Sequence, residues 1–194
     1  MTPQRFQKLQ SVINNRQSNL AVILENVYNP NNVSAVMRTC DAVGIQDIYV
    51  INDKTPPVKS WGRRSNAGTA GWVDVFQYEN VETLIGEVRS KHQLIYASNL
   101  KSGSVPVYDL DLTASIAFIF GNEQDGISGK LSSLADINFI IPQVGMNPSL
   151  NISVACAVTL YESFRQRMLK GAYVGVNPDV NQVTNLSRRW GIAQ

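Results

Sequence analysis

The stretch SIAFIFGNEQDGIS, residues 115–128, joins a strongly apolar run to a loop of small and polar residues. The apolar run predicts a strand buried on both faces, as in a parallel sheet. The same arrangement occurs twice more, where LAVIL (20–24) precedes NPNNVSAVMRT (29–39) and where INFII (137–141) leads into IPQVGMNPSLNIS (141–153). Because ligands of open α/β sheets bind at the carboxyl ends of the strands, we expect the three loops to meet in one site.

Apolar strands alternate with amphipathic helices along the rest of the chain. This predicts an α/β fold, a mostly parallel sheet with helices on both faces. We expect strands at residues 20–24, 47–51, 73–76, 93–97, 115–120 and 137–141, and helices at residues 2–16, 33–43, 81–90 and 151–170. Residues 29–32 are expected to form a loop that caps the helix at 33–43. No linker or internal repeat is visible, so one domain is predicted over residues 1–194. It consists of an N-terminal helix (1–17), a core (18–170) and a polar tail (171–194) that contains a short helix.

Composition restricts the class of protein. Hydrophobic residues make up 44% of the 194 residues and charged residues only 16%, which favours an oligomer over a monomer. A net charge of +2 does not by itself indicate a nucleic-acid-binding protein. The chain shows no leader-like segment and no apolar run of about 18 residues, so we expect a cytoplasmic protein without a membrane anchor.

Several common chemistries are unlikely on the residues present. No GxG occurs, which argues against a dinucleotide-binding turn, and Ile127 occupies the place where a P-loop has its lysine. The single histidine, His92, follows polar residues at a helix end and is expected to be solvated, which argues against a Ser-His-Asp hydrolase. Cys40 and Cys156 stand in unrelated contexts, and no carboxylate–histidine cluster indicates a catalytic metal.

The three polar loops together resemble the motifs of the SPOUT superfamily, in its ribose 2′-O-methyltransferase branch. NNVSAVMRTCDAVG is similar to the first motif, FGNEQDGIS to the second and IPQVGMNPSLNISVACAVTLYE to the third, in family order over nearly the whole chain. The short length and the FRQRMLKGAY ending of the last long helix are most similar to bacterial tRNA guanosine-18 methyltransferases. The resemblance implies a C-terminal trefoil knot, a homodimer, S-adenosyl-L-methionine as the methyl donor and tRNA as the partner, with no role for DNA or a membrane.

The resemblance also implies roles for particular residues. The catalytic residues it implies are Arg38, Asn32, Glu123, Ser149 and Asn151. Because a guanidinium group stays protonated, we expect Arg38 to hold a phosphate and stabilise the developing alkoxide rather than to accept a proton. The proton would leave through phosphate, water or Glu123. Helix capping is the alternative interpretation of Asn32, with which a catalytic role is compatible, and also of Ser149 and Asn151.

Two further sets of residues follow from position in the motifs and from charge. The residues expected to bind the donor are Ser98, Gly121, Ile141, Met146 and Leu150. The residues expected to bind RNA are Arg63 and Arg64 in the long loop 52–71, and Arg165, Arg167 and Lys170 at the end of the last long helix. Further cations that we expect to contact RNA occur in the first helix (Arg5, Lys8 and Arg16) and in the tail, where Arg188 and Arg189 precede Trp190.

The chain departs from the family pattern at two points. Asn31 stands where many relatives have histidine, and MNP precedes Ser149 where relatives often have another pair. The substrate alternatives are therefore a ribosomal RNA or a tRNA wobble nucleotide. An alternative of another class is a non-catalytic RNA-binding protein, and the presence of Arg38, Glu123 and Asn151 argues against it.

Overall fold

A computed structural model describes residues 1–52, 71–173 and 179–192. The sheet has seven strands in the order β3-β2-β1-β6-β4-β7-β5, and every neighbouring pair is parallel. The strands are β1 (Leu20–Glu25), β2 (Asp47–Ile51), β3 (Asp74–Tyr78), β4 (Leu94–Ser98), β5 (Val105–Pro106), β6 (Ile116–Phe120) and β7 (Ile137–Ile140). The predicted fold class, a parallel α/β sheet, is thereby confirmed.

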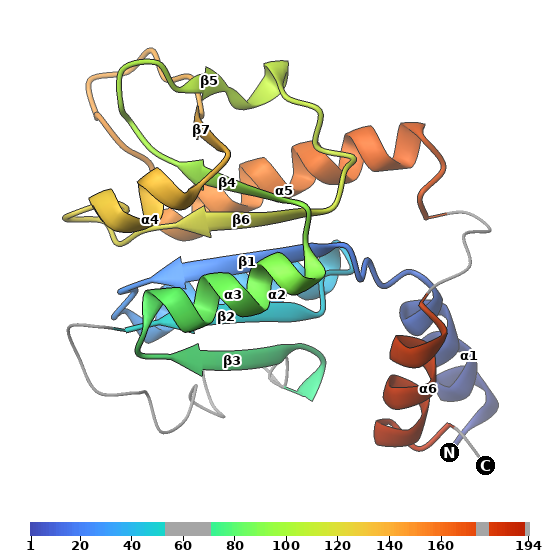
Figure 1. Cartoon of the computed structure of the whole chain (residues 1–194). Helices are drawn as coiled ribbons and strands as arrows, with labels where there is room; N and C mark the ends of the chain where they lie inside the picture. Colours follow the sequence, from blue (N-terminus) through green and yellow to red (C-terminus); the bar gives the residue numbers. More distant parts are fainter. Residues whose placement is uncertain (53–70, 174–178, 193–194) are drawn as a thin grey trace.

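Helices cover both faces of the sheet, as Figure 1 shows. They are α1 (Pro3–Asn14), α2 (Pro30–Ala42), α3 (Val81–Lys91), α4 (Gly129–Leu134), α5 (Ile152–Leu169) and α6 (Val180–Arg189), with a 3₁₀ turn, η2, at Val107–Asp109. Side chains of β1 alternate between the faces. Leu20, Val22 and Leu24 belong to the core beneath α2 and α5, whereas Ala21 and Ile23 belong to the core beneath α3 and α4.

The central strands are buried along their whole length. All six residues of β1 and all five of β6 are buried, and the two strands pair from Leu20–Ile116 to Leu24–Phe120. Because both strands end at the same level, the loops that follow them leave the sheet side by side. The strand order also places β7 between β4 and β5, two strands that precede it in the chain.

Several element boundaries differ from the sequence prediction. The first-motif helix begins at Pro30 rather than at residue 33, because Asn29 is its N-cap and proline suits the first helical turn. Asn32 is therefore inside the helix, so the alternative interpretation of Asn32 as a cap was wrong. The short elements α4, β5 and η2 were not predicted, because two to six residues carry too little periodicity to recognise.

The two terminal helices pack against each other beside the sheet (Figure 1). Arg16, expected as an RNA-binding cation, is instead 3% exposed and donates to Asp41 Oδ1 and to the Trp72 carbonyl, each at 2.7 Å. Its guanidinium also lies over the Trp190 ring, 5.6 Å from the centroid. Arg189 makes two hydrogen bonds to Asp74, at 2.7 and 2.8 Å. The two chain ends are thus held beside the sheet by the contacts of Arg16, Arg189 and Trp190.

The expected solvation of His92 was also wrong. Its side chain is only 3% exposed, and burial lowers its pKa to about 4. The ring is therefore neutral at physiological pH. No helix within the described ranges is long and apolar enough to cross a membrane.

Candidate functional site

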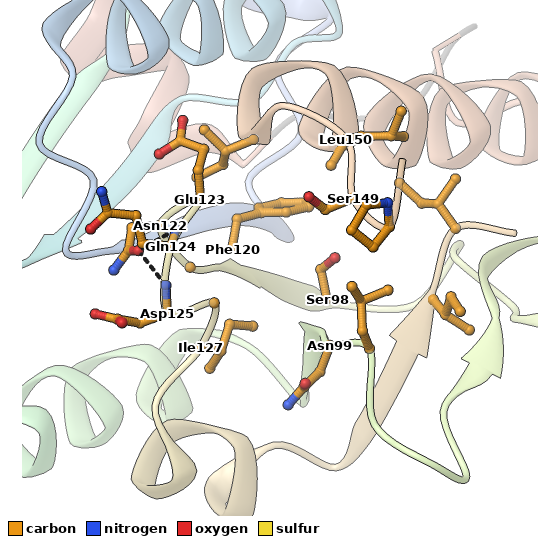
Figure 2. A pocket seen from close by; sticks show the side chains of 18 of the residues that line it. Ser98, Asn99, Phe120, Asn122, Glu123, Gln124, Asp125, Ile127, Ser149 and Leu150 are labelled. Carbon is orange, nitrogen blue, oxygen red and sulfur yellow. Dashed lines mark hydrogen bonds between the residues drawn. The ribbon is translucent and has the colours of Figure 1, made fainter. Parts of the chain in front are cut away.

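The polar loops after β6 and β7 line a cavity of about 400 Å³ at the carboxyl edge of the sheet, and the polar segment after β1 reaches its border where Asn32 contacts Glu123. Figure 2 shows Phe120, Ser98 and Ser149 around the same space, with Glu123 and Asp125 on the loop after β6. The lining comes from the ends of β4, β6 and β7 and from the first turn of α5. It comprises Ser98, Asn99, Leu100, Phe120, Gly121, Asn122, Glu123, Gln124, Asp125, Gly126, Ile127, Ile140, Ile141, Gln143, Pro148, Ser149, Leu150, Ile152 and Ala155.

The loop after β6 is a tight turn closed by its own asparagine. Asn122 Oδ1 accepts from the backbone N–H groups of Gln124 and Asp125, each at 2.8 Å, and the Asn122 carbonyl accepts from Gly126 N at 3.0 Å. Gly121 lies directly against this turn, because a Cβ there would stand 2.0 Å from the Gly126 carbonyl oxygen. The turn can therefore close only with glycine at position 121.

A buried carboxylate anchors the far end of the same turn. Glu25, the last residue of β1, is 2% exposed and accepts from Ser128 N at 2.7 Å. Ser128 in turn caps α4 by accepting from Leu131 N. The position of the turn is thus tied to the central strand of the sheet.

Three side chains from separate motifs contact one another at the cavity. Asn32 Nδ2, in the first turn of α2, donates to Glu123 Oε1, and Asn151 Nδ2 donates to Asn32 Oδ1 at 3.2 Å. Asn151 is the N-cap of α5, with its Oδ1 accepting from Ser153 N. The expected meeting of the three loops is confirmed, and a carboxylate stands at their junction.

The charge of the lining distinguishes between classes of ligand. The described lining residues include two carboxylates, Glu123 and Asp125, and no lysine, arginine or histidine. The charged side chains that a nucleotide phosphate would meet in this described lining are all negative, so a cationic ligand is favoured. Phe120, Ile127, Ile141, Leu150 and Ile152 supply apolar walls for a flat ring.

Residues 19–161 match the model of the SpoU rRNA Methylase family. The chain belongs to this family. The matched range includes all three polar loops and the whole described sheet, so the cavity is built by SpoU family segments.

One curated relative and two solved structures show how far the similarity extends. The SpoU chain is 36% identical over 172 residues to a tRNA (guanosine(18)-2'-O)-methyltransferase of Thermus thermophilus, covering 89% of this chain and 88% of that protein. The crystal structure of the Aquifex aeolicus TrmH/SpoU tRNA modifying enzyme superimposes with a TM-score of 0.84 at 32% identity, over 96% of this chain and 94% of that chain. An AdoMet-bound rRNA methyltransferase from Sinorhizobium meliloti gives a TM-score of 0.69 at 28% identity, over 80% of this chain and 59% of that chain.

The residues predicted to bind the donor are mostly brought together in this SpoU site. Ser98, Gly121, Ile141 and Leu150 all line the cavity. Met146 does not, because its side chain stands fully exposed on the loop between β7 and α5. A solvent-exposed apolar side chain of this kind gives no wall to the pocket.

Four of the five predicted catalytic residues lie together at the cavity, and the fifth, Arg38, does not line it. Asn32, Glu123 and Asn151 are in contact, and Ser149 lines the cavity beside them. Arg38 is not among the lining residues. It lies exposed on α2 and has no hydrogen bond or ion pair within the part of the chain that the structure describes.

The predicted RNA-binding residues differ in how far the structure places them at the surface. Arg63 and Arg64 lie outside the described residues. Arg165 is exposed but paired with Glu162 at 2.7 Å, and Lys170 donates to Thr113 Oγ1 at 2.8 Å. Both of these cations remain at the surface of α5.

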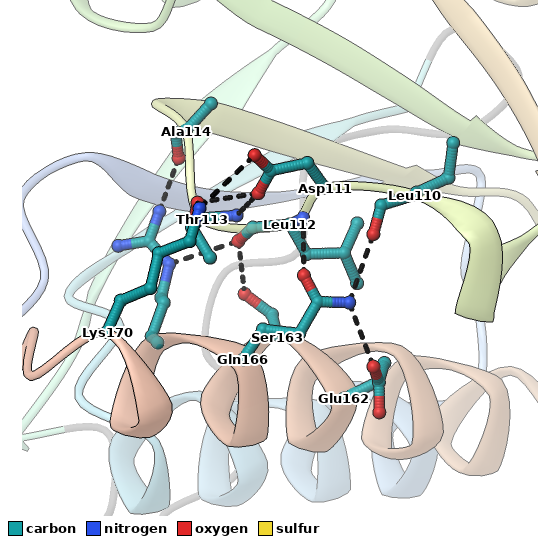
Figure 3. A network of polar contacts seen from close by, with 10 residues as sticks. Leu110, Asp111, Leu112, Thr113, Ala114, Glu162, Ser163, Gln166 and Lys170 are labelled. Atoms are coloured by element: carbon teal, nitrogen blue, oxygen red, sulfur yellow. Dashed lines mark hydrogen bonds and ion pairs between the residues drawn. The ribbon is translucent and has the colours of Figure 1, made fainter.

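Arg167 was wrongly assigned to the RNA-binding surface, because its side chain is only 1% exposed. It donates to Gln17 Oε1 at 3.0 Å, Asn19 Oδ1 at 2.8 Å, the Leu112 carbonyl at 3.2 Å and the Ala114 carbonyl. Figure 3 shows α5 laid along residues 110–114, with Ser163, Gln166 and Lys170 bonded to the same segment. Arg167 thus joins α5 to the start of β1 and to the segment before β6.

Some residues of the site were missed from the sequence. Asn122 closes the turn after β6. Glu25 accepts from Ser128 N at the end of that turn, and Ser153 donates to Asn151. An Asn directly after a strand is a common signal for a turn closed by its side chain, and this could have identified Asn122. Glu25 carries no such signal, because it ends an otherwise apolar strand.

Proposed function

We propose that this protein transfers a methyl group from S-adenosyl-L-methionine to a ribose 2′-hydroxyl of tRNA, at guanosine 18. The observation that carries the proposal is the contact of Asn32, Glu123 and Asn151 beside an anionic, apolar-walled cavity. The Thermus thermophilus relative, named for this activity and aligned over 89% of the chain, supports the choice of nucleotide. A tRNA substrate implies action in the cytoplasm.

The cavity fits the proposed donor in shape and in charge. S-adenosyl-L-methionine supplies a methyl group already activated by a positively charged sulfur. Backbone groups of the turn after β6 would hold its adenine between Phe120, Ile141 and Leu150, and Glu123 and Asp125 would favour its positive charge. The Sinorhizobium meliloti structure, which contains bound AdoMet, supports the choice of donor.

Protein groups would orient the hydroxyl and take its proton. The new bond joins the ribose oxygen to the methyl carbon as the carbon–sulfur bond breaks, and the hydroxyl proton passes to the Glu123 carboxylate. Arg38, free of partners among the described residues, would hold the adjacent phosphate and stabilise the negative charge on the oxygen. Holding the reacting atoms within about 3.5 Å of each other would lower the barrier further, because the reactants need not lose that freedom of motion during the step.

We further propose that the C-terminal segment threads a loop of the chain and forms a trefoil knot. The strand order supports this, since β6 lies between β1 and β4 and β7 lies between β4 and β5. Each strand is thus inserted between two strands that precede it in the chain. A crystallographic backbone trace without the crossing would contradict the proposal.

The working form is proposed to be a homodimer joined through α5. Val154, Tyr161 and Met168 recur every seventh residue on this helix and are 46%, 52% and 44% exposed. Such a stripe marks an apolar helix face without a partner in the monomer. The stripe lies on the helix that begins at the cavity, so a second copy would also border the site.

The deciding experiment is methylation of unmodified tRNA transcripts with labelled S-adenosyl-L-methionine, followed by mapping of the modified ribose. We expect the label on guanosine 18 and its loss with Arg38→Ala. Label on a wobble nucleotide or on ribosomal RNA would refute the substrate assignment. Donor binding without transfer to any RNA would support the alternative of a non-catalytic RNA-binding protein.

A further inference from the structure

A continuous chain of hydrogen bonds runs from Ser153 to Glu123. Ser153 Oγ donates to Asn151 Oδ1 at 2.6 Å, Asn151 Nδ2 donates to Asn32 Oδ1 at 3.2 Å, and Asn32 Nδ2 donates to Glu123 Oε1. The chain links the start of α5, the first turn of α2 and the turn after β6. Ser153 itself does not line the cavity.

The direction of this chain is set by a backbone group. The N–H of Ser153 can only donate, and it bonds to Asn151 Oδ1 at 2.9 Å. Asn151 must therefore present its oxygen to α5 and its NH2 group to Asn32. Asn32 is then oriented in the same sense, with its NH2 group directed at the Glu123 carboxylate. The cap of α5 thus determines that Glu123 receives a donor.

We propose that Ser153 is a positioning residue for methyl transfer, because its hydroxyl reinforces the orientation of Asn151 that the backbone N–H sets. In this orientation the Asn32 NH2 group is directed at Glu123, the proton acceptor. This inference rests on the proposed function. Ser153 acts through two amides on Glu123, the group that takes the proton from the ribose hydroxyl. When the Ser153 hydroxyl is removed, Asn151 Oδ1 keeps the hydrogen bond from the Ser153 backbone N–H but loses the second of its two donors.

The first test compares Ser153→Ala, Ser153→Thr and wild type in single-turnover methylation of tRNA. Loss of one hydrogen bond from the chain is expected to lower the rate about three- to tenfold, with KM for tRNA and for donor unchanged. Threonine keeps the hydroxyl and is expected to restore the rate. Ser90→Ala is the matched control, since Ser90 is exposed on α3 and, within the described ranges, its hydroxyl bonds only to the Glu87 carbonyl of its own helix. An unaltered rate in Ser153→Ala would overturn the proposal.

A double-mutant cycle with Glu123→Gln separates positioning from a general loss of structure. If Ser153 acts through Glu123, then Ser153→Ala causes no further loss in the Glu123→Gln background. If the fold-loss in rate of the double variant equals the product of the two single losses, Ser153 acts independently of Glu123, and the proposal fails.

A third measurement does not depend on activity. The side-chain NH2 signal of Asn32 in an ¹⁵N-correlated NMR spectrum is expected to shift in Ser153→Ala and to stay in place in Ser90→Ala. Ser153 reaches Asn32 through Asn151, so a shift reports transmission along the chain of hydrogen bonds. A stationary Asn32 signal would overturn the inferred chain. If the signal shifts but the wild type methylates no tRNA, the proposed function fails instead, and the catalytic role of Ser153 fails with it.

Discussion

Replacing Arg167 with methionine should destabilise the protein without directly weakening its contact with RNA. The change retains most of the side-chain volume but removes the donors that satisfy Gln17, Asn19 and the carbonyls of Leu112 and Ala114. At about 1 kcal/mol for each acceptor left unpaired, the loss in free energy of unfolding is about 4 kcal/mol. That is a large share of the roughly 5–15 kcal/mol typical of a folded domain.

Urea denaturation followed by tryptophan fluorescence measures this loss. Arg165→Met is the matched control on the same helix, because Arg165 is exposed and its ion pair with Glu162 is screened by solvent, so its loss should change the urea midpoint little. The salt dependence of tRNA affinity provides a second readout. It should have the same slope in Arg167→Met as in wild type, since a buried arginine neutralises no phosphate.

The opposite pattern would refute this reasoning. An unchanged urea midpoint in Arg167→Met, together with weaker tRNA binding and a shallower salt slope, would show that Arg167 contacts RNA. The burial of the side chain at 1% exposure makes the stability effect the expected one.

Three other changes test separate parts of the structure. Gly121→Ala should lower kcat/KM about a hundredfold by displacing the turn, because the new Cβ would stand 2.0 Å from the Gly126 oxygen, whereas Gly129→Ala has open space and should not. The pKa of His92 is about 4 in the folded protein and 6.5 in the unfolded chain, so protons bind the unfolded chain more tightly. As the pH falls from 6.5 to 4, the free energy of unfolding of wild type should therefore fall by about 3 kcal/mol more than that of His92→Gln. Equal pH dependence of the two urea midpoints would contradict this. Tyr161→Glu should shift the mass measured by light scattering from dimer to monomer, and a dimeric variant would argue against the α5 interface.

Local sequence patterns were sufficient to predict the layers of the fold. Apolar runs such as residues 116–120 became buried strands, because a parallel sheet covered on both faces needs apolar side chains in both directions. The polar loops after three of these runs were expected at one edge, and the Asn32–Glu123 and Asn151–Asn32 contacts confirm it. Both results depend on features that lie within about fifteen consecutive residues.

The strand order could not be obtained in this way. Whether β6 pairs with β1 or with β5 depends on contacts between segments almost a hundred residues apart, and no periodicity records them. A short helix was expected in the C-terminal tail, and α6 confirms it, but its position was not predicted. The helix packs against α1 beside the sheet, with Trp190 next to Arg16, and these contacts join segments from the two ends of the chain.

What the sequence determined by itself was therefore the alternation of strands and helices and the three loops that carry polar residues. What only the tertiary structure decided was the use of each charged or polar side chain. Arg165 and Arg167 are two residues apart on one helix, yet one is exposed and the other is buried among four acceptors. A helix turns by about 100° per residue, so neighbouring positions face different surroundings, and those surroundings come from distant parts of the chain.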